Sequence, residues 1–189
     1  MHSIEYNLAL LKEMMAEFES FAISQELFWP LQKKSFRSLP FPQLSIGALL
    51  LTSDELMAQQ SEMDAIQDRE CQRLMLEFET FVRRWRSAIE RKAAGELKSR
   101  TNLWQAYLQD LEEYPDEVEE YARQVRNRVL MSKLKARTAG FQPEVEFDVL
   151  QELDQRLMLT AMSVEFLWDE RLKPIYPIEQ YPFLYIQPR

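Results

Sequence analysis

The fold is decided by residues 52–95, which read TSDELMAQQSEMDAIQDRECQRLMLEFETFVRRWRSAIERKAAG. Thr52 and Glu55 have the spacing of a capping box, in which two side chains satisfy each other's free backbone N–H groups where a helix begins. Farther along, apolar residues recur at alternating steps of three and four, as in helices that pair side by side: Cys71, Leu74, Phe78, Phe81, Trp85 and Ala88. Gly95 then supplies a left-handed C-terminal cap. We therefore predict one long helix over about 53–94.

Such a helix has consequences for the shape of the molecule. At 1.5 Å per residue it would be about 60 Å long, which exceeds the width of a globule of this size. It must therefore protrude, kink or pair with something. Its first half, to about Glu70, has a weak apolar face, since polar residues occupy the heptad positions there: Gln60, Asp64 and Gln67. We expect this half to project, bend or meet a partner.

Four more helices are predicted around the long one. Apolar residues between Ile4 and Ala22 follow helical spacing. Three further pairs have the spacing of a capping box and open the remaining helices: Asn102 with Gln105, Asp116 with Glu119, and Asp148 with Gln151. These helices are expected to close at Pro115, before Gly140 and at Pro174, respectively. The predicted fold class is all-α, an elongated helical bundle of about five helices.

Two segments do not read as helices. The stretch over 30–52 contains Pro40, Pro42 and Gly47, which favours an irregular loop, with a short helix or strand over 44–51 as an equal alternative. The stretch over 174–189 has four prolines among large apolar and aromatic residues, so we expect an extended tail. We predict a single helical domain over 1–173, with the tail packing on the bundle or on a partner.

Composition places the chain among ordinary globular proteins. Hydrophobic residues make up 46% and charged residues 29% of the 189, and three glycines are too few for a turn-rich β fold. The single cysteine cannot form an internal disulfide, and the first residues do not resemble a signal peptide. No apolar run approaches the roughly 20 residues that span a bilayer. We expect a cytoplasmic protein that does not enter the membrane.

Most catalytic classes lack their minimal residues. Nucleophilic catalysis needs a base beside the nucleophile, and His2 is the one histidine, at a terminus. Zinc, haem and iron–sulfur sites need several histidines or cysteines, so we expect no cofactor. Cys71 is interpreted as a core residue. The acidic run over 116–120 resembles helical carboxylate metal motifs but has no second motif downstream; its alternative is a first helical turn that complements the helix dipole.

Charge is unevenly distributed. The chain has net charge −8, yet residues 83–100 have net charge +5 and residues 123–137 have net charge +6. These basic segments predict a phosphate or nucleic-acid surface, with these candidate contacts: Arg83, Arg84, Arg86, Arg91, Lys92, Arg126, Lys133 and Lys135. The alternative is that they pair with acidic runs at 110–120 and 144–154 or form solvated faces. The acidic pI near 4.9 argues against nucleic acid.

The tail offers a second candidate surface. Proline-punctuated aromatic segments dock in extended form on grooves, and the candidate contacts are Tyr176, Tyr181, Phe183 and Tyr185. The groove would belong either to the chain's own core or to a partner. We therefore predict a non-enzymatic interaction or scaffold subunit with a protein partner, or a homodimer through the long helix. The alternatives are a nucleic-acid-associated accessory protein and a carboxylate-dependent metalloenzyme.

Overall fold

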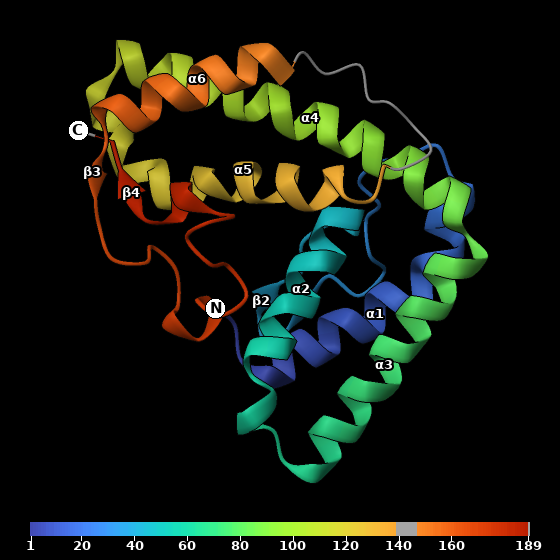
Figure 1. Cartoon of the computed structure of the whole chain (residues 1–189). Helices are drawn as coiled ribbons and strands as arrows, with labels where there is room; N and C mark the ends of the chain where they lie inside the picture. Colours follow the sequence, from blue (N-terminus) through green and yellow to red (C-terminus); the bar gives the residue numbers. More distant parts are fainter. Residues whose placement is uncertain (139–146, 189) are drawn as a thin grey trace.

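The computed structural model describes residues 1–138 and 147–188. Within these ranges the chain forms six α-helices, which confirms the all-α class (Figure 1). Their bounds are α1 Ile4–Ile23, α2 Ile46–Ala58, α3 Ala65–Arg84, α4 Arg86–Glu113, α5 Tyr121–Lys135 and α6 Phe147–Thr160. Short 3₁₀ turns cover Gln60–Glu62, Pro115–Glu120, Glu170–Leu172 and Pro182–Leu184. Two small antiparallel pairs join β1 Ser35–Phe36 to β2 Leu39–Pro40 and β3 Met162–Ser163 to β4 Ile186–Gln187.

The helices form two groups that share α2. In the first, α1 packs against both α2 and α3; in the second, α5 and α6 both pack on α4. Helix α2 also contacts α4 and α5, so it connects the groups. Figure 1 shows α4 and α5 side by side, α6 along α4, and α3 meeting α4 at an angle.

The prediction of one helix over 53–94 is wrong, because the segment contains two breaks. The first lies at residues 59–64. There Asp64 caps α3, and its carboxylate accepts from the backbone N–H groups of Ile66 (2.8 Å) and Gln67 (2.9 Å). The Gln67 side chain completes this capping box by accepting from the backbone of Asp64. Thr52 caps nothing; its hydroxyl donates to the carbonyl of Ala48 inside α2.

The second break is at Trp85, whose backbone leaves helical geometry (φ −107°, ψ 26°) between α3 and α4. Gly95 is not a cap either, since it lies inside α4. A Cβ at Gly95 would come within 2.8 Å of Leu27 Cδ2, so the missing side chain admits Leu27 against the helix. Asn102 also lies inside α4, which continues to Glu113. The longest helix therefore lies later in the chain than predicted.

The buried seam of α3 faces its own chain. Cys71, Leu74 and Phe78 are buried, and α3 packs on α1. Phe18 of α1 stacks on Phe81 with ring centroids 5.0 Å apart. The apolar residues of α3 that suggested pairing between two copies of the chain therefore pack on α1 of the same chain.

The segment over 30–52 contains the helix that was the alternative to a loop. Ser45 caps α2 by accepting from the N–H of Ala48 at 3.1 Å. Before it, a two-residue turn joins β1 to β2. Arg37 and Ser38 have positive φ there (47° and 69°), as the tight hairpin turn that matches strand twist requires.

The last helix ends at Thr160 and not at Pro174, which corrects the predicted boundary. Beyond it the backbone pairs with the tail: Val164 N–H donates to the Tyr185 carbonyl (2.9 Å) and Leu167 N–H to the Leu184 carbonyl (3.0 Å). Backbone groups that pair with another strand cannot continue a helix. The tail therefore determines where α6 ends.

A buried carboxylate joins the two groups of helices. Glu96 of α4 is 1% exposed, and its oxygens accept from Gly47 N–H (2.9 Å) and Ser45 Oγ (2.9 Å) at the start of α2. Arg100 pairs with the same carboxylate at 3.1 Å and donates to Asn127 of α5. A Cβ at Gly47 would lie 2.5 Å from Glu96 Oε1, so the approach requires glycine.

Replacing Glu96 with alanine is expected to lower the free energy of unfolding by about 3–5 kcal/mol, because it leaves the Arg100 charge without its carboxylate and the buried Gly47 N–H without an acceptor. Urea denaturation followed by circular dichroism measures this loss. Glu77→Ala is the matched control, since Glu77 pairs with Arg73 on the exposed side of α3 and should matter by less than about 0.5 kcal/mol. Equal losses in the two variants would contradict the role given to Glu96.

Candidate functional site

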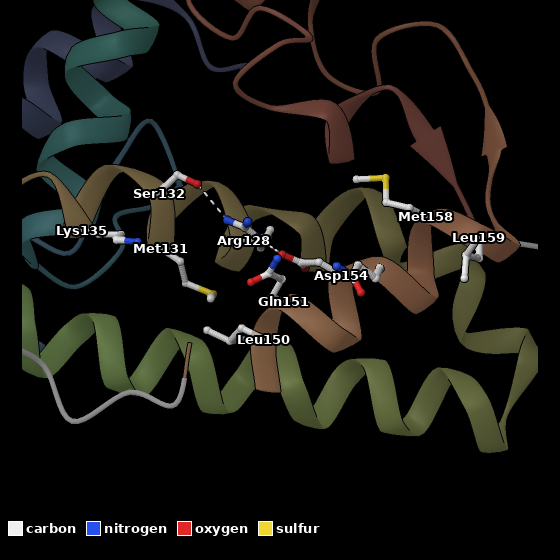
Figure 2. A pocket seen from close by; sticks show the side chains of 10 residues that line it. Arg128, Met131, Ser132, Lys135, Leu150, Gln151, Asp154, Met158 and Leu159 are labelled. Carbon is white, nitrogen blue, oxygen red and sulfur yellow. Dashed lines mark hydrogen bonds and ion pairs between the residues drawn. The ribbon is translucent and has the colours of Figure 1, made fainter. Parts of the chain in front are cut away.

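A hollow between α5 and α6 has a volume of about 830 Å³. Figure 2 shows its side chains projecting from both helices. The hollow exists because α5 and α6 each pack on α4 rather than on each other. Its size falls in the range of ligand-binding clefts. We call it the α5–α6 groove, lined by Arg128, Met131, Ser132, Lys135, Leu150, Gln151, Asp154, Gln155, Met158 and Leu159.

Apolar side chains line both the floor and the rim of this groove. Met131 and Leu150 are buried, at 4% and 5% exposure. Met158 and Leu159 stand at the rim and are 37% and 85% exposed. A single exposed leucine is ordinary in a folded protein, but here apolar side chains line both ends of one hollow, Met131 and Leu150 at one end and Met158 and Leu159 at the other (Figure 2).

An ion pair crosses the groove. Arg128 Nε of α5 lies 2.8 Å from Asp154 Oδ2 of α6, and Arg128 Nη1 donates to Ser132 at 2.8 Å (Figure 2). The other oxygen of Asp154 accepts from the indole N–H of Trp104 at 3.2 Å, and Trp104 is fully buried in α4. These bonds fix α6 against α4 and α5. Arg128 and Asp154 therefore already have partners within the chain.

The first basic segment is largely paired within the chain. Arg84 lies 2.7 Å from Glu19, Arg86 lies 2.8 Å from Glu90, and Arg83 donates to Thr80. Lys92 is 3% exposed. Its ammonium group donates to the carbonyls of Ser24 (3.2 Å) and Glu26 (2.5 Å) just after α1, and burial lowers its pKa. Arg91 is exposed on α4.

The second basic segment has three different environments. Lys133 pairs with Asp54 of α2 at 2.5 Å. Lys135 lines the α5–α6 groove, and Arg126 lines two other hollows. Arg128 pairs with Asp154, which belongs to the acidic run over 144–154.

The tail residues are also placed against the chain's own helices. Tyr176 is 1% and Phe183 3% exposed, while Tyr181 and Tyr185 are half-buried. The Tyr176 hydroxyl donates to Asp54 at 2.5 Å, and burial with this negative neighbour raises the pKa of the phenol. Two of the four candidate contacts are therefore enclosed by the fold.

The remaining chemical candidates are separated. His2 stacks on Tyr6 with ring centroids 4.2 Å apart, and Cys71 is buried on α3, where burial raises the pKa of its thiol. No group of three or more metal-binding side chains occurs among residues 1–138 and 147–188. The acidic run over 116–120 includes side chains outside the described residues. In the same ranges, no helix is long and apolar enough to cross a membrane.

Sequence reasoning did not identify the groove. Leu150, Leu153 and Leu157 follow helical spacing and form one apolar stripe of α6. Met158 and Leu159 follow directly and lie off that stripe. These two residues could have indicated a second contact surface on the helix, because a helix that buries a single apolar stripe does not need apolar residues outside it.

Comparison with known proteins gives no relative: no protein-family model, no curated protein and no solved structure matches this chain. Geometry and chemistry therefore carry the functional argument.

Replacing Asp154 with alanine is expected to lower the free energy of unfolding by about 1–3 kcal/mol, because the buried Trp104 N–H loses its acceptor and Arg128 its partner. Asp154→Asn keeps an oxygen for Trp104 and should lose less. The control is Glu152→Ala, an exposed carboxylate on the same helix. Chemical denaturation of the three variants measures the difference, and an Asp154→Ala loss no larger than that of Glu152→Ala would show that this bond does not fix α6.

Proposed function

We propose that this protein is a non-enzymatic interaction subunit that binds an amphipathic helix of a partner protein in the α5–α6 groove. The observation that carries the proposal is the apolar lining at the two ends of this groove, with buried Met131 and Leu150 at one end and Leu159, almost fully exposed, at the other (Figure 2). Helix-in-groove recognition uses a surface of this kind, into which one apolar helix face inserts.

Methionine at two positions supports a protein ligand. Met131 and Met158 have unbranched, polarizable side chains that adjust to apolar surfaces of different shape. Residues of α6 line the groove from Leu150 to Leu159, and ten helical residues correspond to about 15 Å at 1.5 Å per residue. That length accommodates nearly three turns of a partner helix.

Charge indicates which helix would fit. Two basic residues of α5, Arg128 and Lys135, line the groove, and α5 contributes no acidic residue to it. Opposite charge across an interface speeds association and selects orientation. A partner helix should therefore combine an apolar face of leucine, methionine or phenylalanine with an acidic flank toward α5.

A protein partner is favoured over the other predicted partners. Lys92 and Lys133 bond within the chain, so they contribute less to a phosphate surface than their number suggests. The chain is acidic overall, which repels nucleic acid. The prediction of a homodimer depended on the apolar seam of one long helix. In the structure that seam packs on α1 of the same chain.

The proposal is tested with two synthetic helical peptides of about 18 residues that share one leucine and methionine face. One has glutamate flanks and the other lysine flanks; both carry a fluorescent label for anisotropy at physiological salt. We expect the acidic peptide to bind at least about ten-fold more tightly than the basic one, because of the α5 wall. Leu159→Glu should weaken its binding at least about ten-fold by placing a charge in the apolar contact.

Leu76→Glu is the matched control, because Leu76 is a leucine 62% exposed on α3, away from the groove. It should leave peptide affinity unchanged. The proposal fails if neither peptide binds, or if Leu159→Glu and Leu76→Glu have the same effect. A steep fall in affinity for single-stranded DNA or RNA with rising salt, lost when Arg83, Arg84 and Arg86 are replaced, would instead support the nucleic-acid alternative.

A further inference from the structure

Two hollows of about 360 and 540 Å³ adjoin one arginine on the face of the molecule formed by the start of α1, α2, α5 and the segment after β3. Four residues line both hollows: His2, Leu51, Glu55 and Arg126. Segments far apart in the sequence meet here. Such junctions between elements are where small-molecule sites usually occur.

Arg126 differs from the neighbouring arginines. Arg100 and Arg128 each have an ion pair, whereas Arg126 has no hydrogen bond or ion pair to any residue in the described ranges. Its side chain is exposed by area, yet desolvation by the surrounding protein lowers the pKa of its guanidinium. A side chain in a hollow can be both exposed by area and partly desolvated, because solvent reaches it while protein surrounds it. Its planar array of N–H donors is therefore available to a ligand.

Aromatic rings form the walls on either side. Tyr6 and Phe41 line the smaller hollow, and Trp168 and Tyr176 line the larger one. The polar atoms of three of these rings are already used: Tyr6 donates to the Pro40 carbonyl (2.6 Å), Trp168 to the Ala122 carbonyl (3.1 Å) and Tyr176 to Asp54. Tyr6 and Tyr176 are buried, whereas Phe41 and Trp168 are half-buried and offer ring surface to the hollows. Arg126 offers free N–H donors beside them.

Three other charged side chains around Arg126 have partners. Glu55 Oε2 accepts from the backbone N–H of His2 (3.1 Å) and from the Asn7 side chain (3.0 Å). Arg123 at the edge pairs with Glu120, and Asp169 pairs with Arg171 at 2.9 Å. Glu55 remains a negative charge near Arg126 and would repel a doubly charged anion more strongly than a singly charged one.

We propose that Arg126 and the aromatic walls form a binding site for a small aromatic carboxylate. The carboxylate would accept two parallel N–H···O bonds from the guanidinium, which is the geometry that arginine favours. The aromatic body would pack on the half-buried ring of Phe41 or on that of Trp168. This site is separate from the α5–α6 groove and does not depend on a protein partner.

The test uses isothermal titration calorimetry of the intact chain with four probes: phenylacetate, indole-3-acetate, phenyl phosphate and the neutral amide phenylacetamide. We expect at least one of the two carboxylates to bind with a dissociation constant of about 1 mM or below, as suits a fragment of this size. Phenylacetamide should bind at least about ten-fold more weakly because it lacks the charge. Phenyl phosphate has a second charge, so its affinity should rise more than that of the carboxylates when Glu55→Gln removes the repelling carboxylate.

Variants separate ligand binding from folding. Arg126→Gln should weaken carboxylate binding at least about ten-fold, and Arg126→Lys should retain part of it. Arg91→Gln, an exposed arginine on α4, is the matched control and should change nothing. Glu55→Gln should strengthen binding about three-fold, because its amide oxygen still accepts from Asn7 and His2 while the repelling charge is gone. A purely structural role for Glu55 would not produce a gain.

Three results would overturn the proposal. They are the absence of binding by either carboxylate up to about 10 mM, equal binding of phenylacetate and phenylacetamide, and equal affinities of the Arg126→Gln and Arg91→Gln proteins. Thermal denaturation of each variant shows that it is folded. If Arg126→Gln does not fold, the Glu55→Gln comparison decides: stronger carboxylate binding supports the site, and unchanged or weaker binding overturns it.

Discussion

Glu96 places a carboxylate in the interior of the protein, against the first turn of α2 and beside Arg100. A buried charge is tolerated only when partners satisfy it, so this arrangement allows little freedom in how α2 meets α4. Because α2 also packs on α1 and α5, its position sets how the N-terminal helices lie relative to the α4–α5 pair. Gly47 is part of the same constraint, since any side chain there would collide with the carboxylate. Both the α5–α6 groove and the hollows at Arg126 are bounded by helices that this contact positions.

Sequence patterns predicted the helical class and several helices because helical periodicity and capping are local. The long helix was wrong because two capping boxes compete: Thr52 with Glu55 and Asp64 with Gln67 fit the same pattern, and only one opens a helix. Tertiary packing makes the choice, since Thr52 and Asp54 are buried within α2. The run Ile46 to Leu51 is apolar on every side, so periodicity could not distinguish a buried helix from a strand. Likewise, α6 ends where the tail pairs with the following segment, and that pairing is nonlocal.

The candidate sites were predicted in part. Charge counting found Arg126 and Lys135, which line hollows, but it equally selected Lys92 and Lys133, whose partners are far away in sequence. A count of charges contains no information about pairing across such separations, because pairing depends on how the helices pack. The apolar residues of the groove were not predicted, for a different reason. Met158 and Leu159 lie outside the apolar stripe assigned to α6, and apolar residues off a stripe become meaningful only when a neighbouring helix, here α5, completes a hollow beside them.

Helix α5 contributes to both candidate sites from opposite faces. Arg128, Met131 and Lys135 are spaced by three and four and line the groove, whereas Ala122 and Arg126 are spaced by four and line the hollow beside the tail. Arg126 and Arg128 are two positions apart, and side chains at that spacing do not face each other on a helix. Three contacts hold α5 in place between them: Asn127 with Arg100, Arg128 with Asp154, and Lys133 with Asp54. Coupling between two sites requires an element with two arrangements that both ligands bias. A helix held on several sides by buried or half-buried polar contacts has one arrangement, so we expect the groove and the Arg126 site to bind their ligands independently.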